Sequence, residues 1–216
     1  MLAGAAGAVQ ESAVSSTLPT QLTLARLAAG PIVAGLILWG DAQVFTAGAA
    51  AARWPFAIAL ALFALAALSD ALDGWLARKL AAATPLGAAL DHAADKALTA
   101  AVLLALAVTA LATDLVALAV LILARDAAVA GLREGLALSG RAMPVSVAGK
   151  WKTALLLLGI GAALAMQTLV YFTAPIEAVN AANILARAAL WAGAALAVWS
   201  GWRYFATAFA PPKTEN

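Results

Sequence analysis

Long apolar stretches recur along the whole chain, and short polar or proline-containing segments separate them. Each stretch is near the roughly 20 residues that an α-helix needs to cross a bilayer. The expected helices cover approximately residues 22–39, 54–80, 84–114, 115–138, 145–172 and 181–209. The pattern therefore predicts an all-α polytopic membrane protein with six transmembrane helices.

Three segments are expected outside these helices: a mobile N-terminal segment at residues 1–19, a connection or short surface helix at 40–53, and a polar tail at 211–216. Thr17 or Thr20 would cap the first helix, and Pro19 suits its entry. Residues 20–210 are thus expected to form one transmembrane domain.

Basic residues gather on one side of this topology, because six helices place both chain ends on the same side of the membrane. The residues on that side are Arg78, Lys79, Arg141, Lys150, Lys152, Arg203 and Lys213. The opposite side offers only Arg53 and Arg187. Since cytoplasmic loops are enriched in Lys and Arg, both termini are expected in the cytoplasm, in a bacterial-type inner (cytoplasmic) membrane.

The composition narrows the classes of function. The chain is 65% hydrophobic and 11% charged, which exceeds the apolar share of a soluble domain. It has no cysteine, which excludes thiolate metal sites, and one histidine, His92, which argues against a zinc enzyme. The net charge of +2 does not indicate nucleic acid binding, because the basic residues lie near helix ends and contact lipid headgroups.

Four of the eleven acidic residues, Asp70, Asp73, Asp91 and Asp95, flank the expected turn near residues 81–84. An ionised Asp at the centre of a membrane helix costs about 2.5–3.5 kcal/mol on the insertion scale. Helix geometry places the first two on one stripe and the last two on one stripe of the next helix. A short turn makes these helices antiparallel neighbours, so the two carboxylate pairs are expected to face each other.

Several partners could compensate these carboxylates. Helix capping, pairing with Lys79 or Lys96, and snorkelling to water are structural alternatives, but Lys96 alone cannot balance four charges. Hard divalent cations, Mg²⁺ or Mn²⁺, suit a ligand set made of carboxylates. On the first stripe, Gly74 and Ala77 leave room for a substrate. Arg78 is either a topology-setting charge or a bidentate ligand of a phosphate.

The spacing of these residues resembles the signature of the CDP-alcohol phosphatidyltransferase family, Asp-x2-Asp-Gly-x2-Ala-Arg-x8-Gly-x3-Asp-x3-Asp. Every fixed position is filled here, by Asp70, Asp73, Gly74, Ala77, Arg78, Gly87, Asp91 and Asp95. The resemblance implies a six-helix fold, a homodimeric state and an activity. That activity transfers a phosphatidyl group from a CDP-linked lipid to a hydroxyl group and releases CMP.

The same resemblance implies roles for single residues. The four aspartates would bind two divalent cations that bridge the diphosphate. The CDP-lipid would contact Asp73, Gly74, Ala77, Arg78 and Gly87. Asp95 would also be the base that takes the proton of the acceptor. A carboxylate bound to a metal is a weaker base, so this role requires either an acidified acceptor hydroxyl or a loose metal contact.

The second half of the chain carries further charges. Arg125, Asp126 and Arg133 lie in the fourth expected helix, and Lys150 and Lys152 open the fifth. An Arg–Asp pair inside the membrane is either a self-neutralising structural pair or part of a pocket for an anionic acceptor. Likewise, the lysines are either topology anchors or a phosphate site at a helix N-terminus.

Three local patterns resemble the branch of the family that makes phosphatidylglycerol phosphate from CDP-diacylglycerol. They are Leu22-Thr23-x2-Arg26, Arg125-Asp126 followed by Leu132-Arg133, and Gly149-Lys150-x-Lys152-Thr153. The acceptor implied is glycerol 3-phosphate, with its phosphate on Arg125, Arg133, Lys150 and Lys152. His92 and Asp126 depart from the usual proline and glutamate. Inositol phosphate, serine or phosphatidylglycerol remain alternative acceptors, and a cation channel or transporter is an alternative of another class.

Overall fold

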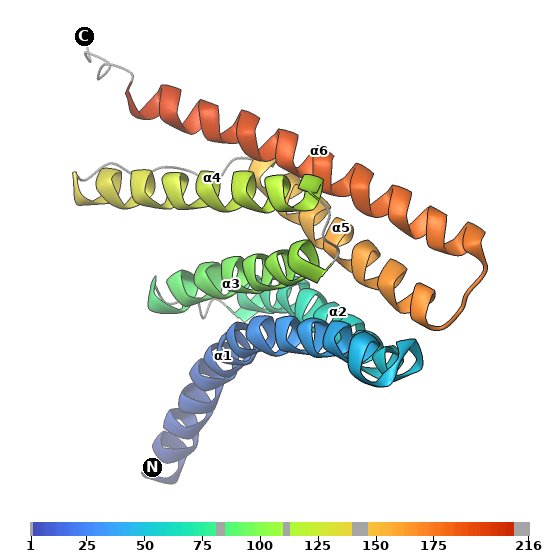
Figure 1. Cartoon of the computed structure of the whole chain (residues 1–216). Helices are drawn as coiled ribbons and strands as arrows, with labels where there is room; N and C mark the ends of the chain where they lie inside the picture. Colours follow the sequence, from blue (N-terminus) through green and yellow to red (C-terminus); the bar gives the residue numbers. More distant parts are fainter. Residues whose placement is uncertain (1, 81–84, 110–112, 140–146, 210–216) are drawn as a thin grey trace.

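The protein is a bundle of six long α-helices, seen in the computed structural model of Figure 1. The model describes the backbone of residues 2–80, 85–109, 113–139 and 147–209, and the side chains of that part except at 2–22, 70–89, 91 and 207. The helices are α1 (Leu2–Ala47), α2 (Ala49–Leu80), α3 (Pro85–Thr109), α4 (Thr113–Leu138), α5 (Val147–Tyr171) and α6 (Ile176–Ala208).

All six helices contain a stretch that is long and apolar enough to cross a membrane. Many large apolar side chains are exposed on their outer faces, including Trp54, Val120 and Trp202. Because helices satisfy their own backbone hydrogen bonds, they are the elements that can span lipid in this way. The prediction of an all-α, multi-pass membrane protein with six spans is confirmed.

The helices alternate in direction and form two groups (Figure 1). Helix α1 packs against both α2 and α3, and α5 packs against α6. The two groups meet where α2 packs on α5 and where α3 packs on α4 and α5. The start of α1 and the end of α6 lie toward the same end of the bundle in Figure 1, as an even number of spans requires. Within the described residues, α1 is the common neighbour of α2 and α3, and no direct packing between α2 and α3 is found.

The helix bounds agree closely with expectation except around the first connection. The prediction of a connection or short surface helix at residues 40–53 is wrong, because α1 continues to Ala47 and α2 begins at Ala49. Gly48 alone joins them, and its φ of 87° is one that glycine adopts without strain. Alanine-rich sequence favours helix, which explains why the small residues here extend both helices. Helix α1 also begins at Leu2, before the start expected at Thr17–Thr20.

Small residues bring the helices close together. A Cβ atom on Gly159 of α5 would lie 2.7 Å from Leu190 Cγ and 2.9 Å from the backbone nitrogen of Leu190 on α6. Glycine at such a position lets two membrane helices gain dispersion contacts over their whole length. The buried core around this crossing includes Leu156 and Ile160 of α5 together with Phe56 of α2. This packing holds the ends of the helices in register around the pocket described next.

Candidate active site

A pocket of about 440 Å³ lies between the ends of α2 to α6 that adjoin the α2–α3 and α4–α5 connections. Half of its polar lining residues are cationic, and cations outnumber the two carboxylates. Its lining residues are Ala67, His92, Asp95, Lys96, Arg125, Asp126, Val129, Ala130, Arg133, Gly149, Lys150, Lys152, Thr153, Ala154, Leu157 and Tyr204. The four basic residues expected to bind an acceptor phosphate, Arg125, Arg133, Lys150 and Lys152, therefore share one pocket with Asp95.

Asp126 is the centre of the charges in this pocket. Lys152 Nζ donates to both carboxylate oxygens, at 2.9 Å to Oδ1 and 3.0 Å to Oδ2. Arg125 Nη1 donates to Oδ1 at 2.8 Å, and Lys96 Nζ donates to Oδ2. The four residues come from α3, α4 and α5, so one carboxylate joins three helices. The side chains of Lys152 and Asp126 are 4% and 11% exposed, which makes this a buried cluster.

Arg125 is fixed to α6 as well as to Asp126. Its Nε donates to the carbonyl oxygen of Ala197 at 2.8 Å, and its Nη2 donates to Ser200 Oγ at 2.8 Å. Gly201 makes room for this arrangement, because a Cβ there would lie 3.1 Å from Arg125 Nε. Each nitrogen of the guanidinium thus donates one hydrogen bond within the protein. The main role of Arg125 is structural, because its hydrogen bonds connect α4 to α6, although it also lines the pocket.

Arg133 lies two turns after Asp126 in α4, on the same face of the helix. Its Nη2 donates to the hydroxyl oxygen of Tyr204 at 3.3 Å, and its guanidinium carbon lies 5.3 Å from the centre of that ring. Its Nε is buried and has no hydrogen-bond partner among the described residues. A buried donor of this kind costs free energy unless a ligand or water satisfies it. Arg133 therefore lines the pocket while one of its buried N–H groups is unsatisfied by the described residues.

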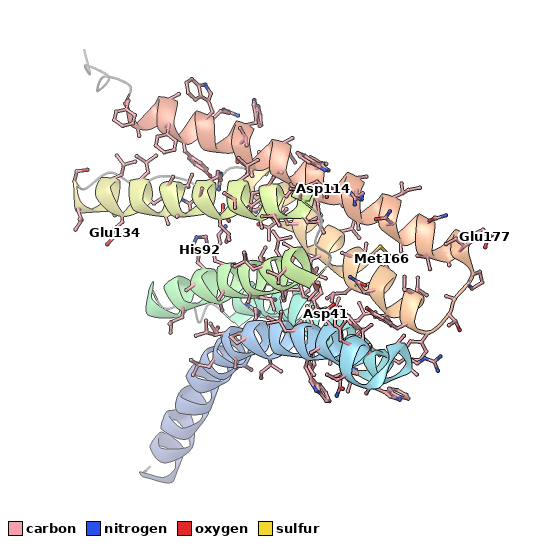
Figure 2. The ribbon with its side chains drawn as sticks, viewed as in Figure 1. Asp41, His92, Asp114, Glu134, Met166 and Glu177 are labelled. Carbon is pink, nitrogen blue, oxygen red and sulfur yellow. The ribbon has the colours of Figure 1, made fainter. Side chains whose placement is uncertain are left out.

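Asp95 and His92 contribute the α3 side of the pocket. Asp95 is partly buried, and its neighbour in sequence is Lys96 of the Asp126 cluster. Figure 2 shows His92 between α3 and α4, at the end of the bundle where Glu134 also lies. Asp114 lies at the opposite end of α4 in the same view. The pocket is thus confined to one end of the bundle.

The remaining residues of the expected site lie outside the described side chains. They are Asp70, Asp73, Gly74, Ala77 and Arg78 of α2, and Gly87 and Asp91 of α3. The backbone is helical through both groups, as the stripe argument required. The turn expected at residues 81–84 also lies outside the described part.

The donor chemistry at the ends of α2 and α3 bears on whether a divalent cation fits there. Among the described side chains there is no group of three or more His, Asp or Glu that could hold a metal. Asp95, from the second carboxylate pair, lines the pocket together with Ala67 of α2, which precedes Asp70 by less than one turn. Four carboxylates on these two helix ends suit hard cations such as Mg²⁺. The donor set therefore fits a divalent cation.

Sequence reasoning missed two features of the pocket. Lys96 was weighed only as a counter-charge for the aspartates, whereas it donates to Asp126 on another helix. Tyr204 of α6 also lines the pocket beside Arg133. Neither contact had a signal in the sequence, because each depends on how α3 or α6 packs against α4. By contrast, Lys150 and Lys152 were predicted because they lie near the start of a helix, in the pattern Gly149-Lys150-x-Lys152-Thr153.

Comparison with known proteins adds an independent observation. Residues 16–199 match the CDP-alcohol phosphatidyltransferase family. A CDP-diacylglycerol–glycerol-3-phosphate 3-phosphatidyltransferase of Bacillus subtilis (strain 168) is 35% identical over 203 residues, which cover 92% of this chain and 98% of that protein. Proteins of the same name from Pseudomonas fluorescens and Cereibacter sphaeroides are 34% and 32% identical, covering 76% and 93% of this chain and 81% and 99% of their own lengths.

Proposed function

The chain belongs to the CDP-alcohol phosphatidyltransferase family, and from this premise we propose that it transfers the phosphatidyl group of CDP-diacylglycerol to glycerol 3-phosphate. The products are phosphatidylglycerol phosphate and CMP, a step of phospholipid biosynthesis. The names of three relatives that match most of this chain support the choice of donor and acceptor.

The observation that carries this proposal is the cationic pocket beside Asp95. Arg133, Lys150 and Lys152 line it together with Asp95, at the end of α3 that carries the signature residues. A phosphate is a dianion that binds well to clustered Arg and Lys donors. Serine offers a carboxylate but no phosphate. The surplus of cations therefore favours a phosphorylated acceptor such as glycerol 3-phosphate.

The family uses divalent metals, and their ligands in this chain are proposed to be Asp70, Asp73, Asp91 and Asp95. Two cations, Mg²⁺ or Mn²⁺, would neutralise the charge that gathers on the phosphoryl oxygens during transfer. Carboxylates from two helix ends would orient the diphosphate of the donor between them.

The donor lipid is proposed to contact the helix α2 segment that follows the first aspartate, with one further contact on α3. The residues are Asp73, Gly74, Ala77, Arg78 and Gly87. Glycine and alanine let the nucleotide lie against the helix backbone, and the Arg78 guanidinium can donate two parallel hydrogen bonds to a phosphate.

Asp95 is proposed to accept the proton of the attacking hydroxyl group. It lines the same pocket as the cations that would bind the acceptor phosphate, so a bound acceptor would present its hydroxyl near the Asp95 carboxylate. A base must lie within hydrogen-bond reach of the proton that it takes, and the position of Asp95 in the lining of this pocket supports the role. Positioning the two substrates side by side supplies much of the remaining rate.

The pocket is proposed to open to the cytoplasm of a bacterial-type inner membrane. Basic residues gather in the helix ends and connections on its side of the topology, including Lys79, Arg141 and Lys150, while the far side offers Arg53 and Arg187. Water-soluble glycerol 3-phosphate would enter from that side. The homodimer implied by family resemblance stays a prediction.

One assay tests the proposal. The purified protein is supplied with CDP-diacylglycerol and Mg²⁺ or Mn²⁺, and CMP release is followed with glycerol 3-phosphate, serine, inositol phosphate and phosphatidylglycerol in turn. We expect release with glycerol 3-phosphate and formation of phosphatidylglycerol phosphate. Release with serine alone would refute the acceptor and keep the family chemistry, whereas no release with any of the four would refute the proposal as a whole.

A further inference from the structure

Asp126 has no acceptor position left for a substrate. A carboxylate offers about four lone-pair positions on its two oxygens. Oδ1 accepts from Arg125 and Lys152, and Oδ2 accepts from Lys152 and Lys96. A direct bond from Asp126 to the acceptor would require it to lose one of these partners. Its contribution to the pocket must therefore pass through the cations that it holds.

The cations need such a partner to lie where they do. Three positive side chains from three helices meet at one buried point, and like charges in a poorly hydrated site repel one another strongly. A buried ammonium group without a compensating anion is also costly, because it has left water. Without the Asp126 carboxylate, Lys96 and Lys152 are therefore expected to turn away from the pocket.

We infer that Asp126 is a positioning residue that holds Lys96 and Lys152 ready for the acceptor phosphate, and that Lys96 is a further ligand of that phosphate. The inference rests on the proposed function, in which a phosphorylated acceptor enters this pocket. Lys96 Nζ has three N–H donors and its side chain is 30% exposed, so it can reach a ligand while it keeps its bond to Asp126.

The geometry of Arg125 supports this assignment. Arg125 donates to Ala197 and Ser200 of α6 and, with its remaining terminal nitrogen, to Asp126 Oδ1. These bonds fix the carboxylate against a rigid helix pair, and a carboxylate so fixed can hold flexible lysines in one place. Lysine side chains lose much rotamer freedom when a ligand orders them, and a site that has ordered them in advance binds more tightly.

A rival view makes the opposite prediction. If Asp126 only reduces the positive charge of the pocket, then Asp126→Asn removes a repulsive anion and strengthens acceptor binding. If Asp126 positions the lysines, the same substitution weakens binding although the pocket becomes more positive. The sign of the change in the KM for glycerol 3-phosphate thus separates the two.

The test compares steady-state kinetics of the full-length protein in detergent with CDP-diacylglycerol held at saturation. For Asp126→Asn we expect the KM for glycerol 3-phosphate to rise about tenfold or more, with kcat within about threefold of wild type. Asp126→Glu keeps the charge and should recover most of the loss. Asp114→Asn, the same change in an ion pair in the first turn of α4, is the matched control and should change neither constant.

A double-mutant cycle tests the route through Lys96. Lys96→Gln should raise the KM for glycerol 3-phosphate by a factor similar to that of Asp126→Asn. In the Lys96→Gln background, Asp126→Asn should raise the KM by a clearly smaller factor than it does in the wild type, because one of the two lysines that Asp126 holds is already gone. The KM for Mg²⁺ should stay unchanged in Lys96→Gln, which shows that adjacent Asp95 is undisturbed. A KM that falls or stays constant in Asp126→Asn, or strictly multiplicative effects in the cycle, would overturn the inference.

If Asp126→Asn folds poorly, a binding measurement on other variants still tests the positioning role of Asp126. The same measurement separates that role from the proposed transferase function. Glycerol 3-phosphate without donor lipid should raise the unfolding temperature of the wild type and, nearly as much, that of Asp126→Glu, but clearly less that of Lys96→Gln. Stabilisation of Lys96→Gln equal to that of the wild type would refute the inference. Wild-type protein that binds glycerol 3-phosphate in this way but releases no CMP would refute the proposed function alone.

Discussion

Helix α4 carries one aspartate in its first turn, Asp114, and one at its middle, Asp126, and the ion clusters around them differ in almost every physical respect. Asp126 is 11% exposed and accepts hydrogen bonds from Lys96, Arg125 and Lys152. Asp114 is 31% exposed and pairs with Arg187, which is 47% exposed. The residue type, the helix and the kind of bond are the same. The difference lies in burial and in the number of cations.

The comparison teaches where charge in this membrane protein is structural and where it can do chemistry. An exposed pair gains little, because water and salt compete with it. A buried carboxylate with three cations is costly to assemble and is strongly coupled to its partners. The buried cluster borders a pocket, and this pocket also holds Asp95. Burying surplus charge does not stabilise a protein, which favours a functional role for the cluster of Asp126 and its three cations.

The largest difference between the two ends should appear in turnover. Asp95→Asn keeps the size of the side chain and removes its basicity, so we expect kcat to fall by about 10²–10⁴-fold, the usual contribution of a general base. Binding of Mg²⁺ and CDP-diacylglycerol should persist, measured by equilibrium binding to the purified variant. Asp114→Asn provides the comparison at the other end and should turn over normally. Turnover retained by Asp95→Asn would remove Asp95 from the role of base.

The six helices and the membrane class were predictable because hydropathy and span length act locally. The first connection was not, since alanine-rich residues 40–53 favour helix as strongly as their neighbours do and only Gly48 interrupts them. In the pocket, the signature spacing pointed to Asp95, and helix-start position pointed to Lys150 and Lys152.

The partners of Asp126 could not be predicted from sequence. An Arg–Asp pair within this helix was one of the open alternatives, but Lys96 and Lys152 reach the Asp126 carboxylate from two other helices. Contacts between residues 30 apart depend on helix rotation and packing, which small residues such as Gly159 set through close approach. Hydrophobic periodicity does not specify that rotation in helices that are apolar on nearly all sides.

The next effect in size concerns stability and compares the two arginines. Arg125→Ala leaves the buried Asp126 with less compensation and removes both bonds to α6, so we expect a loss of about 3–5 kcal/mol in the free energy of unfolding. Arg187→Ala removes an exposed partner and should cost about 0–1 kcal/mol. Unfolding by SDS in mixed micelles, followed by circular dichroism, measures both. Equal losses would mean that burial does not distinguish the two clusters.

Arg133 gives a smaller effect, on acceptor affinity. Its buried Nε has no partner among the described residues, and its Nη2 bond to Tyr204 is long, at 3.3 Å. Arg133→Lys keeps the charge but loses the planar donor fork, so we expect the KM for glycerol 3-phosphate to rise about 5- to 20-fold. Kinetics with CDP-diacylglycerol at saturation measure this rise. Arg187→Lys, the same change at the far end, is the control, and an equal KM in both variants would exclude Arg133 as a phosphate ligand.

The smallest expected effect is that of Asp114→Asn on stability. Removing one charge of a half-exposed pair should change the free energy of unfolding by about 0–1 kcal/mol, because Arg187 keeps its bond to Asn183 and its contact with water. The loss should shrink further at high salt, since screening already weakens the pair. Unfolding titrations at low and high ionic strength test both statements. A loss near that of Arg125→Ala, insensitive to salt, would show that the far end also depends on a desolvated ion pair, and the contrast between the ends would then reduce to the pocket alone.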